Sequence, residues 1–311
     1  MGFRHVPVLP TEIQRFLDLH PDDICVDATI GGAGHAKGIC RSIFPDGSFI
    51  GLDRDREAID HARQALAPYT SMVRLFNDNF VNLPRILAGL DIDGVDAMVV
   101  DLGISLHQIR QSGRGFSFQA DEPLDMRMNA GADLTAADLV NRLSEKELSG
   151  IFRQYGEERW AIRIARAIGA ARQKAPIEKS RQLSEIVSGA IPKSRQPRRI
   201  HPATRVFMAL RIAVNRELDC LAEFLSFGPG LLKTGGRLCM IAFHSLEDRM
   251  IKRRFNALAK GCTCPPDFPI CACGQKPMVR LLTRKVVRPG QAEITANPMA
   301  RSAKLRALIR L

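Results

Sequence analysis

Polar side chains follow four short apolar segments in the first third of the chain. Segments 24–27, 48–53 and 95–101 each end in an aspartate, and segment 72–76 leads into a polar cluster. Near-continuous apolar runs of this kind are typical of strands in a parallel sheet that is covered on both faces. Ligands bind at the carboxyl ends of such strands, so we expect one edge of the sheet to collect these polar groups: Asp27, Asp53, Asn77–Phe80 and Asp101.

A glycine-containing loop lies between the first two segments. It reads Gly31-Gly-Ala-Gly-His35, and Asp53 follows Gly31 by 22 residues. Glycines let the backbone approach a ligand closely, and the N-terminus of the next helix offers N–H groups. A carboxylate about 20 residues further on accepts hydrogen bonds from ribose hydroxyls. This pair indicates a nucleoside cofactor. The alternative is a tight strand–helix turn with a solvated aspartate.

Two details favour S-adenosylmethionine (AdoMet) over a nicotinamide cofactor. The loop lacks the complete G-x-G-x-x-G pattern that binds a pyrophosphate. Asn79 and Phe80 can hydrogen-bond an adenine edge and stack on its face, although such a pair also occurs in capped turns. A nicotinamide-dependent oxidoreductase is therefore the second hypothesis for an enzyme, and a calorimetric comparison of AdoMet and NAD binding would separate the two.

Asp101 begins the sequence Asp-Leu-Gly-Ile-Ser105 after the fourth apolar segment. In an AdoMet-binding sheet this position is nearest the methyl group to be transferred. A carboxylate there can accept N–H bonds from an exocyclic aromatic amine and steady it for in-line attack. Positioning of this kind can supply roughly 7–11 kcal/mol of the barrier. The alternative is that Asp101 only caps the following turn.

The strand signals stop in the middle of the chain. Between residues 109 and 205 the apolar spacing predicts only helices, over 136–143, 145–155, 158–172 and 184–190. The strand–helix alternation resumes after His201-Pro202, with a strand at 237–243 and a helix at 246–258. We therefore expect a discontinuous α/β domain at 1–108 and 206–311, interrupted by an all-helical domain at 109–205.

The net charge of +12 is concentrated at the C-terminal end. From Arg249 to Leu311 there are 14 lysines and arginines but only Asp267 and Glu293 as acids, so the rest of the chain is neutral. A basic region on a neutral body indicates a polyanion as partner, and nucleic acid fits better than a membrane surface. The alternatives are a solvated tail, or a tail in which Arg301, Lys304, Arg306 and Arg310 pack back on the sheet.

Four of the eight cysteines crowd into one short segment, as Cys262-Thr-Cys264 and Cys271-Ala-Cys273. Thiolates are ligands for tetrahedral zinc, but each C-x-C pair is closer in sequence than the usual C-x2–4-C. Reduced thiols in a loop and a disulfide are the alternatives, and no metal is assigned. The chain shows no signal-peptide pattern and no apolar run long enough for a bilayer, so we expect a cytoplasmic protein.

Long motifs along nearly the whole chain resemble the RsmH (MraW) family of 16S rRNA cytosine-N4 methyltransferases. They occur in the same order as in that family: 5–9, 27–35, 53–55, 101–105, 114–118, 123–128, 155–159, 201–205, 243–248 and 297–302. The resemblance implies a Rossmann-like, AdoMet-dependent methyltransferase sheet with an inserted helical domain that recognises the substrate. It also implies methylation of the N4 amine of a cytidine in the decoding region of 16S rRNA, with the small ribosomal subunit as partner.

The resemblance places cofactor-binding residues on seven positions: Ala33, Gly34, His35, Asp53, Phe80, Asp101 and Gln108. Asp53 is expected to hold the ribose and Phe80 to pack on adenine. Ala33 stands where a glycine is common, which matters only if its φ must be positive. The candidate catalytic residues are Asp101, Ser105 and His244, and Ser245, Arg114 and Phe116 are further candidates for contact with the base. His244 can equally be a structural histidine. A non-catalytic RNA-binding assembly protein is the third hypothesis, which methyl transfer to small subunits would exclude.

Overall fold

The computed structural model describes residues 7–195, 200–262, 264, 270 and 273–311. The chain forms two compact units, one made of residues 1–103 and 219–311 and the other of residues 104–218. No helix in the described part of the chain is long and apolar enough to cross a membrane.

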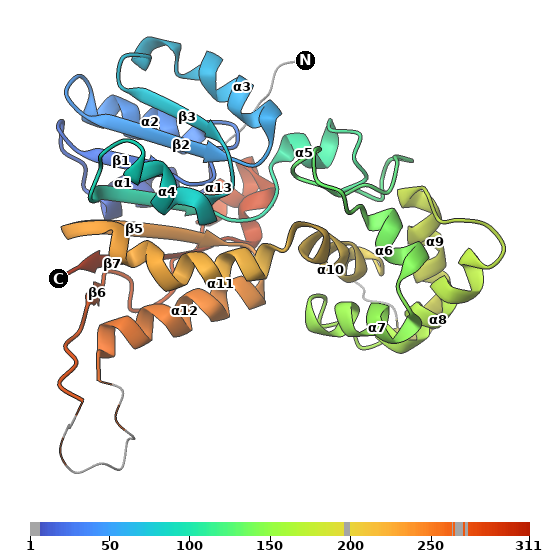
Figure 1. Cartoon of the computed structure of the whole chain (residues 1–311). Helices are drawn as coiled ribbons and strands as arrows, with labels where there is room; N and C mark the ends of the chain where they lie inside the picture. The colour runs from blue at the N-terminus through green and yellow to red at the C-terminus, as the bar shows by residue number, and fades with distance from the viewer. Residues whose placement is uncertain (1–6, 196–199, 263, 265–269, 271–272) are drawn as a thin grey trace. The chain divides into compact units, whose positions relative to one another are not determined.

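The first unit is built on a seven-stranded sheet with the order β3-β2-β1-β4-β5-β7-β6 (Figure 1). Strands β1 to β5 pair in parallel, and β7 is antiparallel to both β5 and β6. The bounds are β1 (Ile24–Asp27), β2 (Ser48–Asp53), β3 (Val73–Asn77), β4 (Val95–Asp101), β5 (Leu232–Ala242), β6 (Val279–Leu281) and β7 (Lys304–Arg310). The parallel α/β sheet expected from the sequence is confirmed.

Helices cover both faces of this sheet. On one face, α1 (Pro10–Leu17), α2 (Gly34–Ile43) and α3 (Arg56–Ala65) share a core with alternate strand residues such as Phe49 and Val99. The other face carries α4 (Leu83–Ala88), α11 (Glu217–Phe227) and α12 (Ser245–Lys260) (Figure 1). Helix α13 (Gln291–Ala296) precedes β7 in the chain. The intervening strand residues, among them Ile50 and Val100, are also fully buried. Burial on both faces explains why the strands are continuous apolar runs.

The C-terminal basic segment is part of the sheet. Lys304–Arg310 forms β7 between β5 and β6, so the alternative in which the tail packs back on the sheet is the one observed. Within it, Nε of Arg306 lies 2.7 Å from Oδ1 of Asp248 on α12, and Arg310 donates to the carbonyl oxygens of Gly230 and Leu232. Arg301 is exposed. Two of the four tail cations are thus used for internal contacts.

The second unit is helical. Its helices are α5 (Leu106–Arg110), α6 (Ala136–Arg142), α7 (Glu145–Gln154), α8 (Ala161–Arg172), α9 (Ser180–Ala190) and α10 (Thr204–Asn215). Thr135 with Asp138 and Ser144 with Glu147 form reciprocal capping boxes at the starts of α6 and α7. The apolar residues of α8, which lies in the predicted helix 158–172, are buried in a core shared with α6, α7, α9 and α10.

This unit is larger than the 109–205 segment expected from the sequence. Residues 206–225 lie in the segment that the sequence assigned to the α/β domain, but they fall on two helices that belong to different units. Arg216 separates α10 from α11 with a φ of 50°, a left-handed conformation that ends a helix. Phe207 and Leu210 of α10 therefore pack in the helical core.

We predict that Arg306→Gln lowers the free energy of unfolding by about 2–4 kcal/mol. The reason is that Asp248 would keep a largely buried charge without its ion-pair partner. Arg301→Gln is the matched control and should change stability by less than about 0.5 kcal/mol, because Arg301 is exposed. Urea unfolding followed by circular dichroism measures both, and equal midpoints for the two variants would contradict the prediction.

Candidate active site

The parallel registers bring the polar strand ends to one edge of the sheet. Asp53 at the end of β2 is level with Asn77 of β3, and Asp27 at the end of β1 is level with Gly51 and Val99. The strand order reverses between β1 and β4, the place where open α/β sheets form a ligand-binding crevice. The structure thus brings together the four polar strand ends that the sequence singled out.

Asp53 holds the glycine loop in place. Its Oδ2 accepts a hydrogen bond from the N–H of Gly31 at 2.9 Å, and its Oδ1 accepts one from the N–H of Asp55 at 2.9 Å. The carbonyl oxygen of Asp53 also accepts from Nδ2 of Asn77 at 2.9 Å. Each carboxylate oxygen has further lone pairs that can accept hydrogen bonds from a ligand. Asp53 is therefore both a structural residue of the loop and a candidate for binding ribose.

The Thr29 side chain connects β1 to β4. The N–H of Asp101 donates to Oγ1 of Thr29 at 2.6 Å, and the N–H of Thr29 donates to Oδ1 of Asp27 at 3.1 Å. Analysis of the sequence missed Thr29, whose only signal is its place directly after a strand end. Its hydroxyl fixes the backbone of Asp101, so the carboxyl group of that residue starts from a defined position.

The carboxyl groups at this edge have raised pKa values. Burial raises the pKa of Asp53 to about 6 and that of Asp27 to about 7. Burial, together with the nearby Asp27 and Glu247 carboxyls, raises the pKa of Asp101 well above its usual value. Several buried acids in one place favour the binding of a cation, because a positive charge stabilises their ionised forms.

Oδ1 of Asp101 is a polar atom at this edge of the sheet whose hydrogen-bonding capacity is not satisfied. It is buried and accepts no hydrogen bond from any residue that the structure describes. Oδ2 of the same carboxyl lies 3.8 Å from Nε2 of His35, whose side chain is almost fully buried. Buried polar atoms are nearly always satisfied in native proteins, so an unsatisfied carboxylate oxygen here indicates a ligand.

The start of α2 supplies the other side of the loop. His35 lies in the first turn of this helix, and Ala33 precedes it with a φ of 57°. A positive φ is strained for a residue with a Cβ, by about 1–2 kcal/mol. The alanine at this position, where glycine is common, is therefore accommodated at a cost in backbone strain. The N–H groups in the first turn of a helix have no partner within the helix, so the start of α2 can bind a ligand.

Phe80 is almost fully buried at the start of the short helical turn after β3. Its ring meets that of Phe224 on α11 edge to face, with centroids 5.5 Å apart. Cys220, one turn earlier on α11, accepts from Nδ2 of Asn79 at 3.3 Å. These contacts hold Phe80 against α11 directly after the end of β3, and Phe80 stays a candidate to pack on a purine ring.

His244 is the N-cap of α12. The N–H of Glu247 donates to its Nδ1 at 3.4 Å, while the N–H groups of Phe243 and His244 donate to Oε2 of Glu247 at 2.8 and 3.2 Å. Nε2 of His244 also lies 3.1 Å from Oε1 of Glu247. The structure thus gives His244 a capping role. The spacing of His244 and Glu247 is the signal of a capping box that could have predicted this role.

Ser105 and Gln108 belong to the helical unit and cap α5. The Ser105 hydroxyl accepts from the N–H of Gln108 at 3.2 Å, and Oε1 of Gln108 accepts from the N–H of Ser105 at 3.0 Å. Arg114 donates to the carbonyl oxygens of Arg127 and Met128 at 3.1 and 2.9 Å. Phe116 is buried in the helical core. All four side chains therefore have structural contacts within their own unit.

These observations fit AdoMet, a nucleoside that carries a positive sulfonium group. Asp53 and Phe80 are the candidates for contact with its ribose and its adenine, and the buried acids around Asp101 suit its positive charge. A sheet with β7 inserted antiparallel between β5 and β6 is the arrangement of Rossmann-like, AdoMet-dependent methyltransferases. The fold and the site together define this class of protein.

Comparison with known proteins identifies the family. The model of the MraW methylase family matches residues 2–311. The chain is 54% identical over 307 residues to the Ribosomal RNA small subunit methyltransferase H of Desulforapulum autotrophicum, covering 98% of each chain. It is 51% identical over 311 residues to the protein of the same name from Geobacter sulfurreducens, covering 100% of each chain. The chain belongs to the MraW methylase family, whose members use AdoMet.

We predict that Asp53→Asn weakens AdoMet binding by about 1.5–3 kcal/mol, which is at least a tenfold rise in the dissociation constant. Charge-assisted hydrogen bonds to the ribose would be lost. The amide would also face a backbone N–H of Gly31 or Asp55 with a donor group. Isothermal titration calorimetry measures the effect. Asp91→Asn removes the same charge from an exposed loop and should bind AdoMet as the unmodified protein does.

AdoMet affinity should rise between about pH 5 and pH 7. Asp53 and Asp27, with pKa values of about 6 and 7, ionise over this range and then attract the cation. The stability of the free protein should depend on pH in the opposite direction. The folded state holds protons that the unfolded state has lost, so the free energy of unfolding falls as pH rises from about 4 to 7. Calorimetry measures AdoMet affinity and urea unfolding measures stability across this pH range. If neither quantity changed with pH, the raised pKa values of Asp53 and Asp27 would be contradicted.

Proposed function

We propose that this protein transfers a methyl group from AdoMet to the exocyclic N4 amine of a cytidine in the decoding region of 16S rRNA. The names of the relatives, Ribosomal RNA small subunit methyltransferase H, support the small ribosomal subunit as partner. The motifs shared with cytosine-N4 methyltransferases support the base and the atom. The observation that carries a catalytic role is the buried Oδ1 of Asp101 at the end of β4.

In this proposal Asp101 is the residue that handles the amine. The lone pair of an exocyclic aromatic amine is delocalised into the ring, which makes the nitrogen a poor nucleophile. A carboxylate oxygen that accepts one N–H bond holds the nitrogen in line with the methyl donor. AdoMet supplies an electrophilic methyl group on its sulfonium when it is bound.

Asp101 can also receive a proton. The methylated amine must lose one, and a carboxylate with a raised pKa is a stronger base than an exposed one. A positive charge bound nearby lowers that pKa again and keeps the carboxyl ionised before the transfer. Thr29 positions the group through the backbone of Asp101. Ala33, Gly34, His35, Asp53 and Phe80 would bind the cofactor.

The other candidates also have structural roles in this proposal. His244 and Glu247 fix the turn after β5, next to β4 in the sheet, and so act as positioning residues. Ser105 and Gln108 fix the start of α5 directly after the Asp101 motif. Gln108 remains a proposed cofactor contact and Ser105 a proposed catalytic residue.

The target amine lies on the Watson–Crick edge of cytosine, so the base must be unpaired or turned out, at a cost of a few kcal/mol. Exposed cations can offset this cost through phosphate contacts. On the first unit they include Lys252, Arg253, Arg280, Arg284 and Lys285, and on α8 of the helical unit Arg163 and Arg166. The helical unit is the proposed substrate-recognition domain. Exposed charge on both units suits an extended RNA.

Incubation with labelled AdoMet and small subunits that lack the modification tests the proposal. We expect one labelled cytidine in the decoding region, and mapping of the labelled nucleotide would show it. Asp101→Asn keeps the hydrogen bond to Thr29 and should slow transfer by at least about a hundredfold, as expected for a lost proton acceptor. Asp91→Asn should transfer at the normal rate.

The possible results separate the alternatives. Label on another nucleotide would contradict the proposed target, whereas absence of transfer despite AdoMet binding would favour a non-catalytic RNA-binding protein. Binding of NAD in place of AdoMet would favour an oxidoreductase. Normal turnover of Asp101→Asn at saturating AdoMet and RNA would leave Asp101 as a structural cap.

A further inference from the structure

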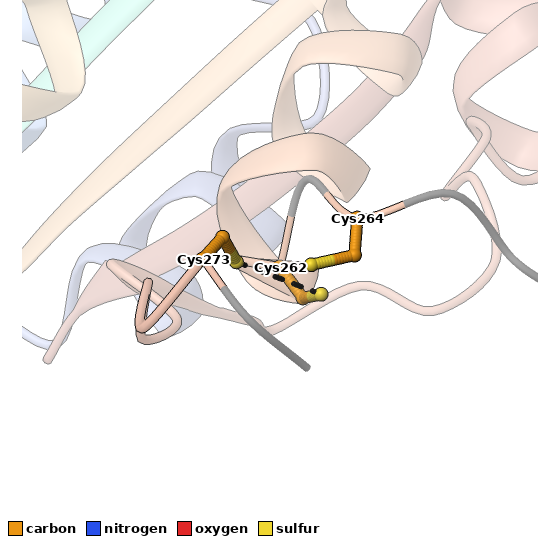
Figure 2. Close-up of side chains that lie close together, drawn as sticks. All are labelled: Cys262, Cys264 and Cys273. Carbon is orange, nitrogen blue, oxygen red and sulfur yellow. Dashed lines mark hydrogen bonds between the residues drawn. The ribbon is translucent and has the colours of Figure 1, made fainter. Parts of the chain in front are cut away.

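Three cysteine side chains gather beyond the C-terminal end of α12. Cys262 and Cys264 follow the helix directly, and Cys273 approaches them from the segment that leads into β6 (Figure 2). Their sulfur atoms all lie within 4.8 Å of one another, and each residue is partly exposed. The proposed methyl transfer does not use these cysteines. Cys271, the fourth cysteine of the sequence motif, lies outside the described residues.

The spacing of the sulfurs matches metal coordination better than a disulfide. Sγ of Cys273 lies 3.8 Å from Sγ of Cys262, whereas bonded disulfide sulfurs are about 2.05 Å apart. Sulfurs bound to tetrahedral zinc at about 2.3 Å are separated from each other by about 3.8 Å, the edge of that tetrahedron. The sulfur pair thus already has the separation of two ligands of one zinc ion.

The backbone around the cluster holds its two parts together. Gly261 has a φ of 67° and Gly274 a φ of 62°, so left-handed glycines turn the chain on both sides of the cluster. A Cβ on Gly261 would collide with the backbone of Lys276 and Pro277. The N–H of Met278 donates to the carbonyl oxygen of Leu258 at 3.0 Å. The ends that carry Cys262 and Cys273 are therefore packed side by side without any metal.

We propose that Cys262, Cys264 and Cys273 bind one structural zinc ion. Binding converts three thiols to thiolates and releases three protons, with no change in oxidation state. A disulfide would instead need an oxidant to accept two electrons. A water molecule or one further side chain completes the tetrahedron. Soft thiolate ligands in tetrahedral geometry select zinc over magnesium and calcium.

Such a zinc ion would close the loop that joins α12 to β6. The loop leaves the helix at Lys260 and returns at Lys276, and both of these lysines are exposed. Three thiolates with one Zn²⁺ carry a net charge of −1, which these cations would partly balance. The site lies beyond the C-terminal end of α12, whereas His244 and Glu247 are at its N-terminal end. The ion is therefore structural in this proposal and takes no part in methyl transfer.

Metal analysis of the whole protein is the direct test. The protein would be purified without chelator from zinc-supplemented medium, and elemental analysis should find about one zinc per chain. Variants Cys262→Ser, Cys264→Ser and Cys273→Ser should each lose most of it. Cys40→Ala is the matched control, because Cys40 is a buried thiol on α2 in the core of the sheet unit, and it should keep the full zinc content.

Cobalt binding provides a second test that needs no variant to fold. Zinc-depleted protein titrated with Co²⁺ alone should develop thiolate-to-cobalt charge-transfer bands and tetrahedral d–d bands, and equimolar Zn²⁺ should abolish them. Trypsin should cut after Lys260 several-fold faster in the depleted protein than in the zinc-bound protein. AdoMet affinity should be the same in both forms.

Several results would overturn the proposal. One is that the purified protein contains no zinc and binds neither Co²⁺ nor Zn²⁺ on titration. Another is a cobalt spectrum without sulfur-to-cobalt charge-transfer bands. A third is that the three serine variants retain zinc. A mass 2 Da below that of the reduced chain, under conditions that keep the other thiols reduced, would show a disulfide and also overturn it. None of these results depends on methyl transfer, so failure of the zinc site and failure of the proposed function are distinguishable.

Discussion

The hydrogen bond from the N–H of Gly31 to the Asp53 carboxylate is the contact on which the site depends. It ties the loop after β1 to the end of β2, and thereby sets the direction in which α2 begins. The parallel pairing of β1 with β2 and β4 places Asp27 and Asp101 at the same edge. A backbone hydrogen bond from the N–H of Ile30 to the carbonyl oxygen of Leu52 holds the same loop against β2.

Burial gives these carboxyl groups their chemistry. In water, Asp27, Asp53 and Asp101 would all be ionised near neutral pH and interchangeable as acids. Desolvation raises all three pKa values, and the proximity of other carboxyls raises the pKa of Asp101 further. A site of this kind is poised for a cationic ligand, whose charge compensates for the water that the acids have lost. The energetic cost of burying these acids in the free protein is offset when the cation binds.

Helix α12 contacts the sheet near its N-terminal end and leads into the cysteine cluster at its C-terminal end. At its N-terminus, Glu247 accepts hydrogen bonds from the backbone after β5 and keeps that turn close to the carboxyl end of β4. In the first turn of the helix, the ion pair between Asp248 and Arg306 joins α12 to β7. Beyond its C-terminus lie the three cysteines. The basic C-terminal region therefore stabilises the sheet unit, in addition to any contact with RNA.

Much of the sheet could be predicted because its residues are unambiguous locally. The strand bounds at Ile24–Asp27, Ser48–Asp53 and Val95–Asp101 are those of the apolar runs themselves, since a strand buried on both faces needs apolar side chains throughout. The same pattern predicted that the polar residues at the ends of these strands lie together at one edge of the sheet. Strand β7 was read as a basic tail, because Lys304, Arg306 and Arg310 obscure its alternation and their partners are distant in sequence.

The sequence by itself determined the fold class, the family and the polar groups at the strand ends, because these depend on local patterns and long motifs. Only the tertiary structure decided which of those groups stay available to a ligand. Ser105 and Arg114 are equally polar in the sequence, yet each makes structural contacts, whereas Oδ1 of Asp101 and Nε2 of His244 are buried and make no hydrogen bond with the described residues. Hydrogen-bond satisfaction depends on neighbours from several segments, and the order of residues along one segment does not contain it.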